Sequence, residues 1–523
     1  MSENTTTKKK SGLDKVLDAI ERGANKLPTP FTLFCILFAV TAIISLILGL
    51  TNVEMIHPST GDVVTVNNFF TRDGVVWFVT KMVTNFTGYA PLGLVLVMTV
   101  GIGMLEQTGM VNVLLKTVMS KVPPVLVPLG CAFIGICGNL FSDSCAVIIP
   151  PLAALAFLGV GKHPLAGMMC AFLGTQAGFS ANIIIAGTDG LLAGITNTVL
   201  DGFFGEGAYH VEVVCNWFFM IASTFFLSIV IAMLDQYLLE PRLGTYVPGK
   251  GSSGEVIEIV DVTPEENRAL VKSGLAALLY IIVIVVGFLT RVLSNENGGI
   301  LSSPLLSGII PILFGLFFIT GLTYGISVKN IRSEADVSKH VIAQLRTMAP
   351  FLASVLASSQ FIQLFTWTNI GTVLSIAGAD LLEATGFTGI PMLICFIILC
   401  AFINLFIGSG SAKWTLMAPI FVPMLTLIGY DPAFIQLAYR IGDSCTNAMS
   451  PMSAYLIMIL AIAQEKYDKD AKLGTFLSNL VPSCLIMLAC WIIFFVLYSM
   501  TGLPIGPGAY MHLPAEVAAT LLH

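Results

Sequence analysis

Charged residues are scarce in this sequence. Asp, Glu, Lys and Arg make up 11% of its 523 residues, whereas 56% are hydrophobic; an ordinary soluble domain carries about a quarter charged residues. A soluble protein with so much apolar surface would aggregate, so the composition indicates a protein embedded in a lipid bilayer. The net charge of −6 is spread thinly. Because nucleic-acid partners require clustered basic surface, we expect none here.

Several catalytic and cofactor motifs are also missing. The chain has no G-x-x-x-x-G-K-[ST] sequence, which disfavours ATP-driven transport within it. The six histidines form no cluster, no Ser/His/Asp or Cys/His set stands out, and the eleven cysteines include no C-x-x-C pair. The cysteines are therefore interpreted as small buried hydrophobes. We expect neither enzyme activity nor a cofactor.

Runs of about 20 apolar residues predict nine membrane crossings. They lie at 29–50, 90–107, 164–199, 213–238, 273–293, 304–325, 347–368, 432–463 and 476–500. The first run is too long for a signal-peptide core and lacks a small-residue cleavage site, so we expect it to be retained. Basic residues fall in alternate loops, at 8–26, 116–121, 242–272, 329–346 and 466–472. The positive-inside rule places these loops in the cytoplasm and the C-terminal tail outside.

The longest of these basic loops carries two local signals. Gly249–Gly254 is a Gly/Ser stretch that predicts a flexible segment. Thr263-Pro264-Glu265-Glu266 then predicts a helix start, with Thr263 as the cap and Glu266 completing a capping box.

Two further apolar stretches predict re-entrant helical hairpins. Each is interrupted at its centre, by Gly138–Ser144 in one and by Gly408–Ser411 in the other. The arms of the first have about 15 residues, or about 22 Å at helical rise, against a hydrocarbon core of about 30 Å. Neither arm spans, so both tips are expected to lie inside the protein. The first hairpin would enter from the cytoplasm and the second from outside.

Each hairpin is followed by a helix with a polar break, at Gly178–Asn182 and at Gly442–Asn447. Both tips contain Asn-Leu-Phe, and each tip asparagine precedes its break asparagine by 43 residues. Equal spacing in units that enter from opposite faces is typical of inverted-repeat secondary transporters, whose sites lie at the repeat interface. The predicted polar shell comprises Asn139, Ser142, Asn182, Asn404, Ser409, Ser444 and Asn447. These side chains either hold a cation such as Na⁺ or only satisfy freed backbone groups.

Charged and aromatic residues near the breaks are candidates for substrate contact, because charge within the membrane is costly. Arg440 could clamp a carboxylate, or could form an intrahelical ion pair with Asp443, which could itself ligate a cation or carry a proton. Asp189 could be functional or could lie in an exposed loop. Trp414 could stack on an aromatic ligand or serve only in packing. Lys413 could bind a second carboxylate or snorkel to the surface.

These features divide the chain into six predicted parts. They are a cytoplasmic segment (1–27), first scaffold helices (28–122), a first repeat (123–200), scaffold and dimerisation helices (201–387, with the cytoplasmic loop 239–272), a second repeat (388–463), and a last helix with an external tail (464–523).

Several long segments resemble the p-aminobenzoyl-glutamate transporter (AbgT) family over roughly residues 28–509. They are Asn85–Gly93, His163–Gly167, Trp367–Gly371, Phe402–Trp414, Ala418–Met424, Ala438–Ser444 and Gly502–Gly508. The resemblance implies a bowl-shaped homodimer in the bacterial inner membrane, with nine membrane helices and two hairpins per subunit and an elevator-like mechanism. It also implies cation-coupled movement of p-aminobenzoyl-glutamate, with export of sulfonamide antimetabolites by some members. The family's functional positions would fall on Asp189, Asn404, Trp414, Pro432, Arg440 and Asp443.

The chain departs from related ion-coupled families at the first tip, where it has Gly138-Asn139-Leu140 in place of Ser-Asn-Thr. Lys413 adds a positive charge near the second site, and both Na⁺ and H⁺ stay open as coupling ion. The expected substrate ligands are Trp414, Arg440, Asp189, Pro432, Lys413 and Ser409; the expected Na⁺ ligands are Asn139, Asn182, Asn404, Asp443, Ser444 and Asn447. The competing hypotheses are proton-driven antimetabolite efflux and, from other classes, a channel or an intramembrane enzyme.

Overall fold

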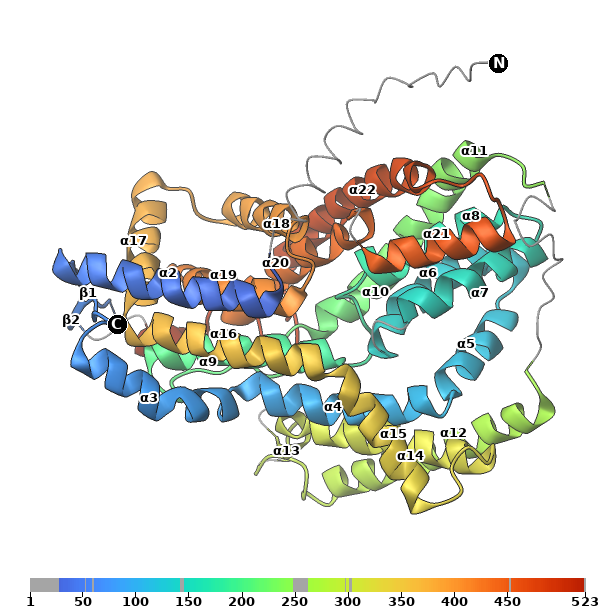
Figure 1. The fold of residues 1–523 in the computed structure, drawn as a ribbon, viewed down its shortest axis with the longest axis horizontal. Coiled ribbons are helices and arrows are strands. Elements are labelled where there is room, and N and C mark those ends of the chain that lie inside the picture. The colour runs from blue at the N-terminus through green and yellow to red at the C-terminus, as the bar shows by residue number, and fades with distance from the viewer. Residues whose placement is uncertain are drawn as a thin grey trace, which may run out of the picture.

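The computed structural model describes residues 28–521, apart from 52, 59–60, 142–144, 248–261, 297, 301–302 and 451–452. The predicted α-helical membrane architecture is confirmed in this part of the chain (Figure 1). One small antiparallel sheet, β1 (Glu54–Ile56) with β2 (Val63–Thr65), adds to it. Ser142 and the Gly249–Gly254 stretch lie outside the described residues.

Among the described residues, seven helical runs are long and apolar enough to cross a membrane. They are α2 (Pro30–Leu50), α3 (Arg72–Thr87) with α4 (Ala90–Gln107), α10 (Trp217–Leu234) with its continuation to α11 (Glu240–Leu243), α12 (Pro264–Leu289), α14 (Ile309–Ser327), α16 (Ala349–Trp367) and α22 (Leu473–Met500). The two remaining predicted crossings are the broken helices described below.

The predicted start of α12 is confirmed. Thr263 Oγ1 accepts a hydrogen bond from the Glu266 backbone N–H at 3.2 Å, and Glu266 Oε2 accepts one from the Thr263 N–H at 2.9 Å. The predicted span 90–107 is only the second half of a bent 36-residue run. The first half contains Arg72, Asp73 and Lys81, and these charges lower its mean hydropathy below that expected of a membrane span.

Several short helices were not predicted. They are α5 (Met110–Ser120), α15 (Glu334–Thr347), α17 (Ile370–Thr385) and α23 (Ala515–Leu521). A search for runs of about 20 apolar residues misses them, because each is too short to span a bilayer.

The two hairpins lie on different sides of α20 (Pro432–Cys445) in Figure 1. The first consists of α6 (Val127–Gly138), a 3₁₀ turn at Asn139–Phe141 and α7 (Cys145–Gly159). The second consists of α18 (Ile390–Asn404) and α19 (Gly410–Leu427). The second turn occupies 405–409, so the predicted turn at Gly408–Ser411 was placed too late. Ser409 is the reason, because its side chain caps α19 and Gly410 already begins that helix.

The helix after the first hairpin is interrupted where the sequence predicted. It comprises α8 (Pro164–Phe172), a π-helical turn (Leu173–Ala177), a non-helical segment to residue 186, and α9 (Gly187–Phe204). The second broken helix comprises α20 (Pro432–Cys445), a 3₁₀ turn (Asn447–Met449) and α21 (Ala454–Lys466).

The predicted second break, Gly442–Asn447, was placed too early. Gly442–Cys445 are helical, so Asp443 and Ser444 lie in the last turn of α20. Ser444 supports that turn by donating from Oγ to the Arg440 backbone oxygen at 2.7 Å, a bond that residues of this type form inside helices.

Glycines bring each hairpin against its broken helix. A Cβ on Gly442 would lie 2.4 Å from the Ile397 backbone oxygen in α18, and one on Gly135 in α6 would lie 2.8 Å from the Ala171 oxygen in α8. Such small residues let helix backbones approach closely. Each hairpin and its broken helix therefore pack as one unit.

Candidate functional site

Helix α20 carries two polar stripes on adjacent faces. Residues four apart on a helix lie above one another. Gln436, Arg440 and Ser444 therefore form one stripe, and Tyr439, Asp443 and the following Asn447 form the other. The first stripe faces the broken helix of the first repeat, and the second faces the tip of the second hairpin.

The first stripe joins the two repeats through a buried ion pair. Arg440 Nη1 lies 2.5 Å from Asp189 Oδ1, and Arg440 Nη2 donates to the Ser180 backbone oxygen at 3.1 Å. Asp189 stands in the first turn of α9, where its Oδ2 accepts a hydrogen bond from the Ala186 N–H at 2.6 Å. The carboxylate thus caps α9 and neutralises Arg440 at once.

Two structural alternatives are contradicted by this arrangement. Asp189 does not lie in an exposed loop, because only 6% of it is exposed. Arg440 and Asp443 do not form an intrahelical pair, because they belong to different stripes and each has another partner of opposite charge.

The second stripe closes onto the second tip. Lys413 Nζ, from the first turn of α19, contacts both Asp443 Oδ1 and Asn404 Oδ1. Tyr439 donates to the Gly410 backbone oxygen at 2.5 Å and lies 3.2 Å from Asp443 Oδ1. We call Asn404, Lys413, Tyr439 and Asp443 the Lys413 cluster. Lys413 does not snorkel, because its side chain is only 1% exposed.

The tip and break asparagines of the second repeat touch. Asn404 Nδ2 lies 2.8 Å from Asn447 Oδ1, 2.7 Å from Thr446 Oγ1 and 2.6 Å from the Asp443 backbone oxygen. In the first repeat, Asn139 instead donates to the Ile136 oxygen at 3.1 Å. Asn182 is 3% exposed, and neither its Oδ1 nor its Nδ2 has a hydrogen-bond partner among the described residues.

The two breaks also meet each other. The Ser180 N–H donates to Ser444 Oγ at 3.1 Å, and Asn447 Nδ2 donates to the Gln176 backbone oxygen at 3.4 Å. Near this contact Arg440 Nε lacks a partner in the described part of the chain. Hard cations prefer amide and carboxylate oxygens as ligands. Oxygens of these types from both repeats therefore lie around α20.

Trp414 is fully buried, so it offers no open stacking surface in this conformation. Its ring lies 4.5 Å from that of Tyr439 at 32°, and its Nε1 donates to Thr196 Oγ1 at 3.0 Å. Thr196 in turn donates to Gln436 Oε1 at 2.8 Å. Sequence reasoning missed Thr196 and Gln436. The signal available for Gln436 was its spacing of four from Arg440.

Pro432 opens α20, as its missing N–H suggested. Asp431 before it caps the helix by accepting from the Ala433 N–H, and also accepts from the Tyr209 hydroxyl, both at 2.8 Å. Burial raises the pKa of Asp431 to about 6, against the lowering effect of these two donors. Ser409 accepts from the Ala412 N–H at 3.3 Å, which gives it a capping role in α19.

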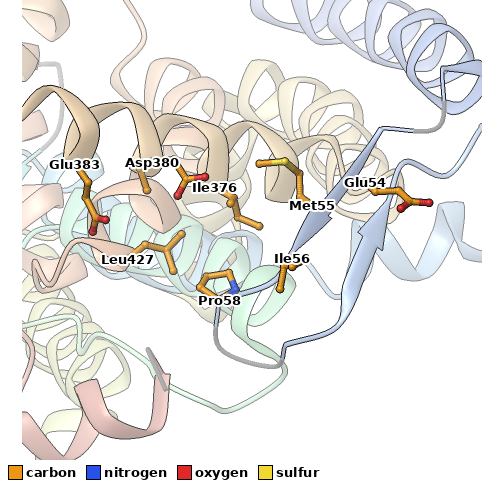
Figure 2. Close-up of a pocket in the computed structure, with 9 residues that line it drawn as sticks. Glu54, Met55, Ile56, Pro58, Ile376, Asp380, Glu383 and Leu427 are labelled. Carbon is orange, nitrogen blue, oxygen red and sulfur yellow. The ribbon is translucent and has the colours of Figure 1, made fainter.

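A cavity of about 390 Å³ lies elsewhere, between the β1–β2 hairpin and α17 (Figure 2). Its lining includes the carboxylates Glu54, Asp380 and Glu383 with the apolar residues Ile376 and Leu427. It is lined by none of the predicted site residues.

Known proteins resemble this chain over nearly its whole length. The model of the AbgT putative transporter family matches residues 15–513. The p-aminobenzoyl-glutamate transport protein of Escherichia coli K12 is 36% identical over 502 residues, which cover 95% of this chain and 97% of that protein.

Two solved structures share the whole fold. The YdaH transporter of Alcanivorax borkumensis has a TM-score of 0.86 at 31% identity, covering 92% of this chain and all of the other. MtrF of Neisseria gonorrhoeae, described as illuminating a class of antimetabolite efflux pumps, has a TM-score of 0.86 at 35% identity, covering 94% of this chain and all of the other.

Proposed function

Because this chain belongs to the AbgT putative transporter family, we propose that it is a secondary transporter for p-aminobenzoyl-glutamate or a similar aromatic carboxylate, coupled to Na⁺ or H⁺. Its relatives are transport proteins and not enzymes. The proposal places the chain in a bacterial inner membrane.

The observation that carries the proposal is the Arg440–Asp189 pair with the unpartnered polar atoms beside it. A buried guanidinium is stable only while a negative charge lies against it. A substrate carboxylate can replace Asp189 as that charge, because the planar fork of arginine matches any carboxylate. Arg440 Nε and the amide of Asn182, which follows by two residues the Ser180 that Arg440 contacts, have no hydrogen-bond partners among the described residues and would be available to such a ligand.

Substrate binding requires this site to open. Trp414, Arg440 and Asn182 are all buried, so the ligand enters only if the hairpins separate from the rest. We infer that each hairpin moves with its broken helix, as their close packing supports, against the remaining helices. Trp414 and Tyr439 would then supply an aromatic surface for the benzoyl ring.

The remaining helices would form a scaffold shared by two copies of the chain. The apolar window of α12 is only 11% buried within one subunit, and that of α2 is 22% buried. Surfaces this apolar need lipid or a second protein surface against them. We propose a homodimer in which one part of these apolar faces contacts lipid and the other part contacts the partner subunit.

Transport into proteoliposomes tests the function. Purified protein would be reconstituted, and uptake of radiolabelled p-aminobenzoyl-glutamate measured under a Na⁺ gradient and under a pH gradient imposed separately. We expect saturable uptake under at least one gradient and counterflow of preloaded substrate. No uptake above that of empty liposomes under either gradient would exclude the proposal, and unsaturable flux would favour a channel.

Export of sulfonamide antimetabolites is the second candidate, and the likeness to MtrF supports it. The same site could serve it, since a sulfonamide with an aromatic amine shares the aromatic part of p-aminobenzoyl-glutamate. Expression in a sulfonamide-sensitive strain would raise resistance, and Arg440→Ala would remove it. Unchanged sensitivity at confirmed expression would exclude this candidate.

A further inference from the structure

Lys413 lies where a bound cation would lie. Its ammonium contacts the Asn404 side-chain carbonyl and the Asp443 carboxylate, and the Tyr439 hydroxyl lies 3.2 Å from the same Asp443 oxygen. Carboxylate, amide and hydroxyl oxygens converging from separate elements are the ligand set of a hard cation such as Na⁺. Here that set comes from the end of α18 and the C-terminal half of α20.

We propose that Lys413 is a tethered cation that fills the cation site of the second repeat, so that this site binds no Na⁺ while Lys413 is in place. The inference rests on the proposed transport function and specifies its ion dependence. It reassigns Lys413, which is then neither a substrate ligand nor a surface anchor.

Burial and helix position both make a charged Lys413 side chain energetically unfavourable. The side chain is 1% exposed, and a buried ammonium carries a desolvation penalty that only close counter-charges offset. It also lies in the first turn of α19, where the helix dipole repels positive charge. Asp443 and Asn404 together offset the desolvation and helix-dipole costs of the buried ammonium. They do so only because α18, α19 and α20 converge at this point.

Charge balance gives a second, independent argument. Among the described residues, the buried charged side chains around the C-terminal half of α20 form two pairs, Lys413 with Asp443 and Arg440 with Asp189. The site is therefore neutral without any added ion. A Na⁺ ion entering beside Lys413 would leave one positive charge buried without a partner, which is strongly unfavourable.

The first repeat has no such cation. Ile148 stands nine residues after Asn139, as Lys413 stands nine residues after Asn404. An isoleucine cannot neutralise a carboxylate, and the helix break there leaves the Asn182 amide unpartnered. The tethered cation therefore belongs to the second repeat alone.

Removing and restoring the tethered charge tests the proposal without substrate. Lys413→Met keeps an apolar stem and leaves Asp443 uncompensated. Lys413→Arg keeps a tethered cation. In Lys413→Met with Asp443→Asn both charges are gone. Thermal unfolding of each purified protein would be compared in NaCl and in choline chloride of equal ionic strength.

We expect Lys413→Arg and the double variant to respond to Na⁺ no more strongly than the wild type does. Lys413→Met should melt at least about 3 °C higher in Na⁺, because Na⁺ bound to the folded state stabilises it. A folded Lys413→Met with no Na⁺ response would overturn the proposal. So would a Na⁺ response of the wild type that Asp443→Asn abolishes, a measurement that holds even if Lys413→Met does not fold.

Counterflow of p-aminobenzoyl-glutamate separates this inference from the proposed function. If the melting temperatures follow the expected pattern while the wild type shows no counterflow, the substrate assignment fails and the tethered cation stands.

Discussion

Arg440 Nη1 and Asp189 Oδ1 form a 2.5 Å ion pair across 251 residues of sequence, and this pair holds the C-terminal half of α20 to the first turn of α9. Each residue has a second task, since Asp189 caps α9 and Arg440 binds the Ser180 backbone oxygen. The pair therefore links the unwound segment of the first repeat to the polar face of α20.

Removing either partner should destabilise the protein, and removing both should destabilise it less than the sum. Asp189→Asn or Arg440→Gln alone leaves a buried unpaired charge, at a cost of about 3–5 kcal/mol. The double variant has no such charge, so its thermal unfolding in detergent should be closer to that of the wild type. Its transport should stay lost, because Arg440 is missing.

The control for this cycle is Arg242→Gln. Arg242 donates to the Ser478 backbone oxygen at 2.9 Å from an exposed position, so its loss should change the melting temperature little. Strictly additive losses from Asp189→Asn and Arg440→Gln would contradict the coupling of the two residues.

Comparing variants of Trp414 and Trp491 separates a role of Trp414 in substrate binding from a role in packing alone. Both are fully buried, and each indole donates one hydrogen bond of 3.0 Å, to Thr196 and to Ser223 respectively. Replacing either by Phe should cost about 1 kcal/mol for the lost bond. Only Trp414→Phe should also weaken transport, with KM for p-aminobenzoyl-glutamate rising about tenfold, which corresponds to about 1.4 kcal/mol of binding. Equal KM values for the two variants would reduce Trp414 to a packing residue.

The helices of this fold could largely be predicted from the sequence. A membrane helix must be long enough to cross the bilayer and must satisfy its own backbone hydrogen bonds, so few arrangements are possible. The interruptions of short apolar arms predicted both hairpins. The equal 43-residue spacing marked Asn404 and Asn447, which touch, but also Asn139 and Asn182, which share no hydrogen bond among the described residues. The helices missed, such as α5 and α17, are too short for the length criterion on which that reading depended.

The site was less predictable, because pairing depends on the angular position of each residue around its helix. Spacing of three placed Arg440 near Asp443, yet the packing of α20 between two units gives each a different partner. No local pattern marks Thr196 or Asp189 as neighbours of α20. Likewise, the burial of Lys413 follows only from the way α18, α19 and α20 converge.

The Asp431 carboxyl should make stability depend on pH. Its pKa of about 6 in the folded state exceeds the ordinary 3.8, so between pH 4 and 6 the folded state binds more protons than the unfolded state. Stability should therefore fall as pH rises through this window, by at most roughly 3 kcal/mol, and change no further from this group above it. Thermal unfolding from pH 4 to 7.5 measures the effect.

Asp431→Asn is the informative variant for this dependence. Its side-chain carbonyl can still accept from the Ala433 N–H, and its amide nitrogen can donate to the Tyr209 hydroxyl in place of the second carboxylate oxygen. The substitution removes the titration. The melting temperature of Asp431→Asn should vary less across the window than that of the wild type. Identical pH profiles would show that Asp431 is not the source.

Asn182 should show a conflict between stability and function. Its buried amide has no partner in the described structure, and an unsatisfied buried polar group costs about 1–3 kcal/mol. Asn182→Leu should therefore leave the empty protein as stable as the wild type or stabilise it, while abolishing transport if the amide binds substrate or ion. Asn197→Leu is the matched control, because Asn197 exchanges hydrogen bonds of 3.0 and 2.8 Å with the Val211 backbone and its loss should destabilise the protein. If Asn182→Leu melts at a higher temperature and loses transport while Asn197→Leu melts at a lower one, the unpartnered amide belongs to the transport site. If Asn182→Leu is stabilised and transports normally, the amide binds no ligand.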